Sequence, residues 1–135
     1  MNIVFVDTGP LQAFNNKDDE HHAVAGKIFL KLQNISIRLI TTDYIIDEAY
    51  TGLLTRAGYN SAMHFDNFLQ QKWGKIIHIT PERFVEAQTV FRRYNQDKIW
   101  SFTDCASFAV MKELKIKTAF TFDDHFEQMG FRILG

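Results

Sequence analysis

Four acidic side chains stand where a predicted strand ends or a predicted helix begins. Asp7 directly follows the first short apolar run of the chain, and Asp123 follows the fourth. Asp104 opens a helix, and Glu48 lies one turn into the helix that comes after the second run. In open parallel sheets, ligands bind outside the carboxyl ends of the strands. We therefore expect these four carboxyl groups to converge on one crevice at that edge.

Carboxylates brought this close together repel one another. Two unit charges 4 Å apart interact by about 4 kcal/mol at an effective dielectric constant of 20, so a cation must balance them. A set of oxygen ligands without Cys or His suits hard cations such as Mg²⁺ or Mn²⁺. Such a site activates water and holds the oxygens of a phosphodiester during in-line displacement. The reaction class that this pattern indicates is phosphodiester hydrolysis.

Asp7 and Asp104 also have a structural interpretation. Asp7 could cap the helix that starts near Pro10, and Asp104 could be the acid of a capping box with Ser101. Both roles satisfy backbone N–H groups at a helix start and need no ligand. Position in the sequence leaves both interpretations open.

The other two acids have acidic neighbours that compete for the same role. A helical wheel places Glu48 outside the apolar arc of its helix, where its position is no more indicative of a site residue than that of Asp47. Asp123 and Asp124 could form a solvated turn, because Asp favours turns. The residue pattern alone does not choose within either pair.

The remaining reactive side chains give weaker signals. His64, His78 and His125 are isolated in the sequence, so we do not expect them to bind metal. Cys105 is the only cysteine; it cannot form an intrachain disulfide, which favours a reducing compartment. The chain has no Gly-rich phosphate loop, no His-Glu-x-x-His and no Gly-x-Ser-x-Gly motif, which argues against nucleotide kinases, zincins and serine hydrolases.

Short apolar runs and helical periodicities alternate along the chain and would position the acids. Strands are expected at residues 2–6, 35–40, 75–79 and 118–122, with a candidate fifth at 131–134. Helices are expected near Pro10, at about 18–32, from 43 to near Gly58, and at about 61–73, 81–94 and 105–114. Because parallel neighbours need crossovers, this alternation predicts an α/β fold with a mostly parallel sheet of four to five strands, covered on both faces.

Length and composition predict one ordinary globular domain over residues 1–135. Apolar residues make up 46% and charged residues 23%, which excludes intrinsic disorder and fibrous repeats. The net charge of −1 excludes a polycation. No apolar run approaches the roughly 18–20 residues of a membrane span, and the chain begins with a strand-like segment instead of a leader. We expect a cytoplasmic protein without a membrane partner.

Four segments carry a resemblance to a known family. They are Val4-Phe5-Val6-Asp7-Thr8, Asp43-Tyr44-Ile45-Ile46-Asp47-Glu48, Ser101-Phe102-Thr103-Asp104-Cys105 with Ser107-Phe108, and Thr121-Phe122-Asp123-Asp124-His125-Phe126. In these segments, which extend in order over essentially the whole chain, the sequence resembles a PIN domain, the nuclease fold best known from VapC-type toxins of bacterial toxin–antitoxin pairs. The resemblance implies a single three-layer α/β/α domain.

The resemblance also implies a set of site residues. The family's acidic quartet falls on Asp7, Glu48, Asp104 and Asp123. This favours Glu48 over Asp47, and Asp123 over Asp124 because Asp123 matches a Phe-Asp-x-His-Phe pattern. In the implied mechanism Asp7 and Asp104 hold the principal Mg²⁺ or Mn²⁺, Asp123 completes that site or a second one, and Glu48 positions or deprotonates the attacking water. Thr8 or Thr103 could order a water at the metal.

The implied function is that of a metal-dependent endoribonuclease, the toxin of a type II toxin–antitoxin pair. Similar proteins cut single-stranded or structured RNA such as tRNA or rRNA, are silenced by a protein antitoxin whose tail fills the groove, and usually form homodimers. Two alternatives stay open within the family: a housekeeping RNA-processing nuclease, and a noncatalytic module that binds nucleic acid or protein.

Two further features of the sequence bear on this interpretation. A phosphoacceptor receiver domain would need an Asp closing the third strand and a Lys closing the fifth, but these strands end at Ile79-Thr80 and near Leu134-Gly135. Without the four site acids, 16 − 4 = 12 acidic residues remain against 15 basic ones, a surplus of +3. The basic residues that could meet phosphate are Lys72, Lys75, Arg92, Arg93, Lys98, Lys112, Lys115 and Lys117.

Overall fold

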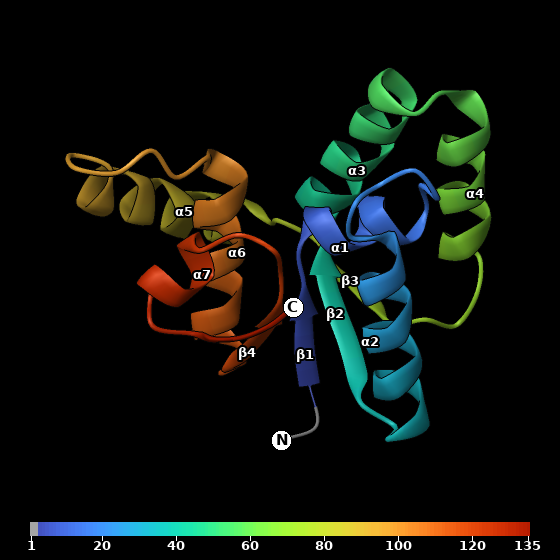
Figure 1. The fold of residues 1–135 in the computed structure, drawn as a ribbon. Helices are drawn as coiled ribbons and strands as arrows, with labels where there is room; N and C mark the ends of the chain where they lie inside the picture. Colours follow the sequence, from blue (N-terminus) through green and yellow to red (C-terminus); the bar gives the residue numbers. More distant parts are fainter. Residues whose placement is uncertain (1–2) are drawn as a thin grey trace.

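The computed structural model describes residues 3–135, and at its centre lies a parallel sheet of five strands (Figure 1). In chain order these are β1 (Ile3–Val6), β2 (Arg38–Thr42), β3 (Lys75–Ile77), β4 (Thr118–Phe120) and β5 (Arg132–Leu134). They lie in the order β3-β2-β1-β4-β5, and every neighbouring pair is parallel. The α/β prediction is confirmed, and the described sheet is more uniform than expected because all five strands run in one direction.

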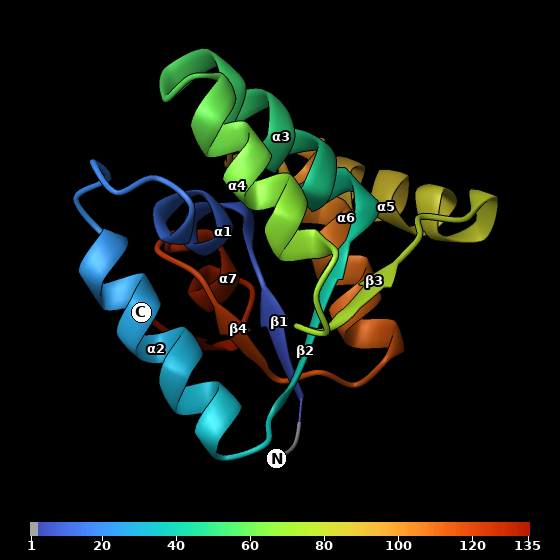
Figure 2. The same ribbon diagram turned by 90° about the vertical axis from the view of Figure 1, so that its right-hand side faces the viewer.

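Helices cover both faces of this sheet, which gives three layers. They are α1 (Thr8–Phe14), α2 (His22–Asn34), α3 (Asp43–Arg56), α4 (Tyr59–Leu69), α5 (Pro81–Tyr94), α6 (Phe102–Glu113) and α7 (His125–Gln128). Helices α1 to α4 lie on one side and α5 to α7 on the other (Figure 1), and Figure 2 looks at the side of α1 to α4. None of the described helices is long and apolar enough to cross a membrane.

Side-chain caps set the starts of two helices at the carboxyl edge of the sheet. The Thr42 hydroxyl accepts a hydrogen bond of 3.2 Å from the backbone N–H of Ile45 at the start of α3. At the start of α5, Thr80 caps the N–H of Arg83 at 3.2 Å, and Pro81 occupies the first helical position. Helix α5 therefore spans residues 81–94, as the sequence predicted.

The predicted boundaries around α2 are wrong at both ends. The helix begins at His22 instead of Asp18 because turns precede it, one of them closed by the Asp19 side chain, which accepts from the N–H of His21 at 2.8 Å. At the other end Ser36 adopts a positive φ of 56°, and the N–H of Ile37 donates back to Leu32 at 3.0 Å. The chain turns where the second strand was expected to start, so β2 begins only at Arg38.

Smaller differences occur at other elements. β3 and β4 each end two residues before their predicted ends at residues 79 and 122, α4 covers 59–69 instead of 61–73, and α6 covers 102–113 instead of 105–114. The first helix begins at Thr8, two residues before Pro10. Helix α7 was not predicted, because four residues are too few to show a helical period. Asn2, the first residue of the predicted first strand, lies outside the described residues.

Aromatic rings form much of the core beneath the carboxyl edge. Five of the 13 Phe residues are among the largest fully buried side chains: Phe5, Phe65, Phe108, Phe120 and Phe126. Phe126 of α7 packs edge-on against Phe108 of α6 at 4.9 Å and also contacts Phe5 of β1 at 6.1 Å between ring centroids. Burial of each ring contributes roughly 1.5–3 kcal/mol. This packing fixes α6 and α7 relative to β1, and those three elements carry or adjoin three of the four predicted site acids.

Candidate active site

Asp7 lies at the end of β1, where the strand turns into α1. Its backbone N–H continues the sheet pairing and donates to the carbonyl oxygen of Phe120 at 3.0 Å. Asp7 stands at the N-cap position of α1 but forms no side-chain capping bond there. Its Oδ2 instead accepts a hydrogen bond of 2.8 Å from the hydroxyl of Thr121, and the residue is only 8% exposed. The capping interpretation of Asp7 is therefore wrong.

Burial changes the acidity of this carboxyl group. Loss of solvent raises the pKa of Asp7 from 3.8 to about 7. Hydrogen bonds from the Thr8 backbone and the Thr121 hydroxyl lower the pKa, and the nearby charges of Asp104 and Asp123 raise it. A buried carboxyl group facing two other carboxylates is an environment that a bound cation would stabilise.

Asp104 lies in the first turn of α6 and points away from its helix. The hydroxyl of Ser101 caps the backbone N–H of Asp104 at 3.0 Å, which is one half of the expected capping box. The Asp104 carboxylate takes no part in the cap: its Oδ2 lies 2.8 Å from Nδ1 of His125. The side chain is 13% exposed and belongs to the wall of a pocket.

Asp123 and His125 follow β4 and meet Asp104 from the opposite side. Oδ1 of Asp123 accepts the backbone N–H of His125 at 2.9 Å and lies 3.4 Å from its Nδ1. One donor atom from each of Asp104, Asp123 and His125 lies within 4.8 Å of the others, a spacing that could hold a metal ion. Asp124, in contrast, is exposed and is not among the residues that line the pocket.

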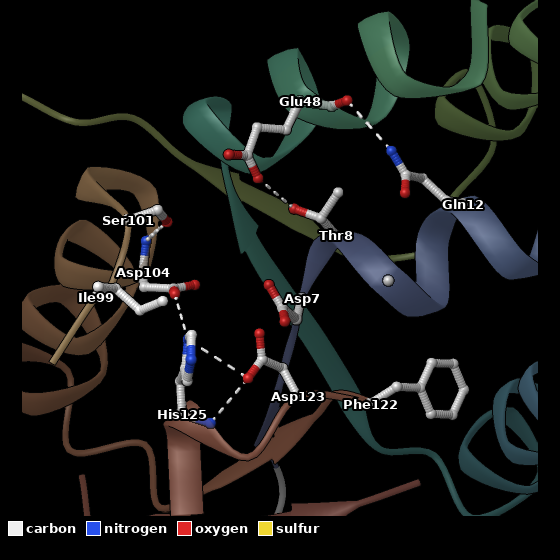
Figure 3. Close-up of a pocket in the computed structure, with 11 residues that line it drawn as sticks. Asp7, Thr8, Gln12, Glu48, Ile99, Ser101, Asp104, Phe122, Asp123 and His125 are labelled. Atoms are coloured by element: carbon white, nitrogen blue, oxygen red, sulfur yellow. Dashed lines mark hydrogen bonds and ion pairs between the residues drawn. The ribbon is translucent and has the colours of Figure 1, made fainter. Parts of the chain in front are cut away.

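Glu48 reaches the same pocket from α3. Its Oε1 accepts a hydrogen bond of 2.9 Å from the hydroxyl of Thr8, the residue next to Asp7 (Figure 3). Gln12 of α1 donates to the backbone carbonyl oxygen of Glu48 at 3.3 Å and so ties the two helices together. Asp47 does not line the pocket.

The four acids come together around one cavity of about 400 Å³ (Figure 3). Its lining residues are Asp7, Thr8, Gly9, Gln12, Glu48, Ile99, Ser101, Asp104, Phe122, Asp123 and His125. The lining described by the structure contains no Lys or Arg, so its charge is negative. The structure thus places the four predicted site residues in one negative pocket; Thr8 is also there, and Thr103 is not.

His125 is a titratable pocket residue that the sequence did not identify as part of the site. It looked isolated because its partner Asp104 is 21 residues away in the chain. The signal that could have found it is its place two residues after Asp123, since residues just beyond a strand share the same edge of the sheet. His125 places an imidazole nitrogen beside carboxylate oxygens, at a site that was expected to contain oxygen alone.

These donors fit a divalent cation. Carboxylate oxygens suit Mg²⁺ and Mn²⁺, and an imidazole nitrogen is more typical of transition metals than of Mg²⁺. The raised pKa of Asp7 is consistent with this fit, because the structure buries the carboxyl group beside two other acids. The arrangement can therefore bind a divalent metal and, through it, an anionic ester.

Comparison with known proteins agrees with this geometry. The family model described as PIN domain matches residues 4–132. The 23S rRNA-specific endonuclease VapC20 of Mycobacterium tuberculosis is 27% identical over 129 residues, which cover 96% of this chain and 95% of that protein. A VapC ribonuclease of Archaeoglobus fulgidus is 30% identical over 113 residues, covering 83% of this chain and 72% of the relative.

Two solved structures share the fold. The crystal structure of M. tuberculosis VapC20, described as a sarcin–ricin loop cleaving toxin, superimposes with a TM-score of 0.84 at 28% identity and covers 95% of each chain. VapBC2 from Rickettsia felis, bound to a DNA fragment from its promoter, has a TM-score of 0.70 at 13% identity, covering 98% of this chain and 97% of that one; this shows the fold alone. The family resemblance is confirmed: the chain belongs to the PIN domain family.

Proposed function

We propose that this protein is a metal-dependent endoribonuclease of the cytoplasm and the toxin of a type II toxin–antitoxin pair. The observation that carries the proposal is the meeting of Asp7, Glu48, Asp104 and Asp123, from four separate segments, at one negative pocket. The names of the relatives support the reaction class, since both are ribonucleases or endonucleases acting on RNA. We take residues 1–135 as one catalytic domain.

Three carboxyl groups would hold the metal. Asp7, Asp104 and Asp123 supply oxygen ligands for Mg²⁺ or Mn²⁺, and His125 keeps the Asp104 carboxylate in place through its bond of 2.8 Å. Mutation of a partner that orients a metal ligand in this way typically lowers metal affinity or activity 10- to 100-fold. A bound metal would polarise the scissile phosphate and make an attacking water more acidic.

Glu48 would act on the attacking water. Its carboxylate is exposed to the cavity and is held by the Thr8 hydroxyl at 2.9 Å, next to the buried Asp7. An ionised carboxylate in this position can orient a water molecule and accept its proton. Thr8, which donates to Glu48, would hold the base in the required orientation.

The substrate and partners follow from the same site and from the relatives. We propose RNA as substrate, in a single-stranded or structured form such as rRNA or tRNA, because the rRNA-specific relative aligns over almost the whole chain. A protein antitoxin would silence the enzyme by covering the pocket, and the active form would be a homodimer.

The test compares Asp104→Asn with a matched control, Asp124→Asn. Asp124 has the same side chain but is exposed and outside the pocket. Expression of the wild type or of Asp124→Asn alone should arrest growth, whereas Asp104→Asn should be harmless. The purified wild type should cleave total RNA with Mn²⁺, and Asp104→Asn should be slower by more than about 100-fold.

Three results would each contradict part or all of the proposal. Equal harmlessness of all three proteins, with RNA left intact in Mn²⁺, would overturn both the toxin and the nuclease assignments. Tight metal and RNA binding without cleavage would instead point to a noncatalytic PIN module. Cleavage without growth arrest would favour a housekeeping nuclease.

A further inference from the structure

The most exposed apolar side chain of the described chain lies at the mouth of the acidic pocket. Ile99 is 91% exposed; the next among the large apolar residues is Tyr59 at 68%. A single exposed isoleucine is ordinary on a protein surface. Ile99 differs because it lines the cavity that holds the four site acids.

The loop that presents Ile99 is firmly held. Asn95 bonds both backbone groups of Trp100: its side chain donates to the carbonyl oxygen at 3.0 Å and accepts from the N–H at 2.8 Å. The Trp100 indole, 3% exposed, packs against Phe108 at 5.0 Å and donates to Gln128 at 3.2 Å. The position of Ile99 is therefore preorganised by its neighbour in the chain.

Phe122 stands on the opposite side of the carboxylates. Figure 3 shows Ile99 to one side of Asp104, Asp7 and Asp123, and Phe122 to the other. The Phe122 ring is stacked on His21, with centroids 4.3 Å apart and planes inclined by 19°. Both apolar side chains line the cavity, so its acidic floor lies between two apolar walls.

Three cations lie around the rings of Tyr94 and Trp100, and Trp100 follows Ile99 in the chain. The Lys98 ammonium lies 5.5 Å from the Trp100 ring and pairs with Asp97 at 3.3 Å. Arg93 and Lys112 lie 5.5 and 5.9 Å from the ring of Tyr94, which itself packs on Trp100 at 5.4 Å. Arg93 and Lys112 are exposed, so a phosphate backbone that continues past Ile99 toward Tyr94 would meet two cations. This favours a nucleic acid over an apolar protein segment as the occupant of the apolar walls.

We propose that Ile99 and Phe122 contact unpaired nucleobases on the two sides of the scissile phosphate. The inference rests on the proposed nuclease function and adds to it the two side chains that would receive the bases flanking the scissile phosphate. Bases in a duplex are stacked and paired, so their faces are not available to such walls, whereas unpaired bases stack readily on apolar and aromatic side chains. The walls contact base faces and therefore require no particular sequence.

The test separates base contacts from phosphate contacts. Fluorescence anisotropy would measure binding of a labelled adenylate octamer and of an octamer of abasic ribose phosphate, with Ca²⁺ as the metal and a gel check that both stay uncut. The variants are Ile99→Ala and Phe122→Leu. Ile35→Ala is the matched control, because Ile35 is 57% exposed and lies outside the pocket.

The wild type should bind the adenylate octamer more tightly than the abasic one. Ile99→Ala should weaken adenylate binding by about five- to ten-fold, the effect of losing a partly buried isoleucine contact, and leave abasic binding unchanged. Phe122→Leu should act in the same direction, and Ile35→Ala should match the wild type. This pattern would support the proposal.

Three outcomes would overturn it. The first is unchanged affinity for both octamers in Ile99→Ala, and the second is an equal loss for both, which would indicate a phosphate contact. The third is a change in molar mass by light scattering without a change in adenylate binding, which would assign Ile99 to a contact between protein chains. In each case cleavage of RNA by the wild type, absent in Asp104→Asn, would leave the proposed nuclease function standing.

Discussion

Asp7→Asn should stabilise the metal-free protein at alkaline pH while destroying its metal site. The wild-type carboxyl group is 8% exposed, and burial raises its pKa from 3.8 to about 7. Ionising it inside the fold therefore costs free energy that an unfolded chain does not incur. Asparagine has nearly the same shape and carries no charge, so the variant avoids this cost.

The size of this stabilisation follows from the pKa values of Asp7 in the unfolded and the folded chain. Each pKa unit corresponds to about 1.4 kcal/mol, so ionised Asp7 lowers the free energy of unfolding by about 4 kcal/mol at pH 8. The amide oxygen of the variant can still accept a hydrogen bond from the Thr121 hydroxyl. Its NH₂ group then faces the N–H of Thr8, and two donors that face each other cost about 1 kcal/mol. The expected net gain is about 3 kcal/mol at pH 8.

The pH dependence has a definite sign. The folded protein keeps the Asp7 proton up to about pH 7, whereas the unfolded chain loses it near 3.8. The favourable contribution of this group is complete below pH 3.8 and is lost as the pH rises through 7. The advantage of Asp7→Asn should therefore grow by about 2–3 kcal/mol between pH 5 and pH 8.

Urea unfolding in EDTA at pH 5, 6.5 and 8 would measure this difference, with Asp124→Asn as an exposed control that should show no such trend. Added Mn²⁺ should stabilise the wild type, by about 2.7 kcal/mol at 100 times its dissociation constant, and should not stabilise Asp7→Asn. An advantage that stays constant from pH 5 to pH 8 would refute the assigned burial and pKa of Asp7.

Two further predictions concern His125 and the aromatic core. His125→Ala should lower Mn²⁺ affinity by about ten-fold in calorimetric titrations, because it removes the donor that orients Asp104. His125→Asn should retain most of the affinity, since its amide can donate from near the Nδ1 position; equal affinities of all three proteins would contradict this role. Phe108→Ala should lower the free energy of unfolding by about 3–5 kcal/mol, because a fully buried ring that packs on Phe126 is lost. Phe91→Ala, at a residue 42% exposed, should cost about 1 kcal/mol in the same urea titrations, and similar losses in the two variants would refute the assigned core.

Local sequence signals predicted the order of elements well. Apolar runs alternate with helical periods, and parallel strands joined by helices leave few arrangements open. Thr80 and Pro81 set the start of α5 because capping and proline geometry act within one turn. The boundaries around α2 failed because turns closed by Asp19 and by a left-handed Ser36 leave no periodic trace.

The choice between neighbouring acids lay beyond the residue pattern. The pattern of residues could not separate Glu48 from Asp47 or Asp123 from Asp124. Only the family resemblance favoured the first residue of each pair. The structure places Glu48 and Asp123 at the pocket and their neighbours outside it. The direction of a side chain at a helix start or strand end depends on what packs against that element, which adjacent residues do not reveal.

The sequence by itself determined the family, the parallel α/β plan and the position of four acids at strand ends and helix starts, because those features are written in local order and spacing. The tertiary structure decided how the acids behave. The Asp7 carboxyl group is buried against Thr121, 114 residues away, and that contact and burial set its pKa. His125 meets Asp104, and Trp100 beside Ile99 donates to Gln128, through contacts between segments that are brought together only by folding.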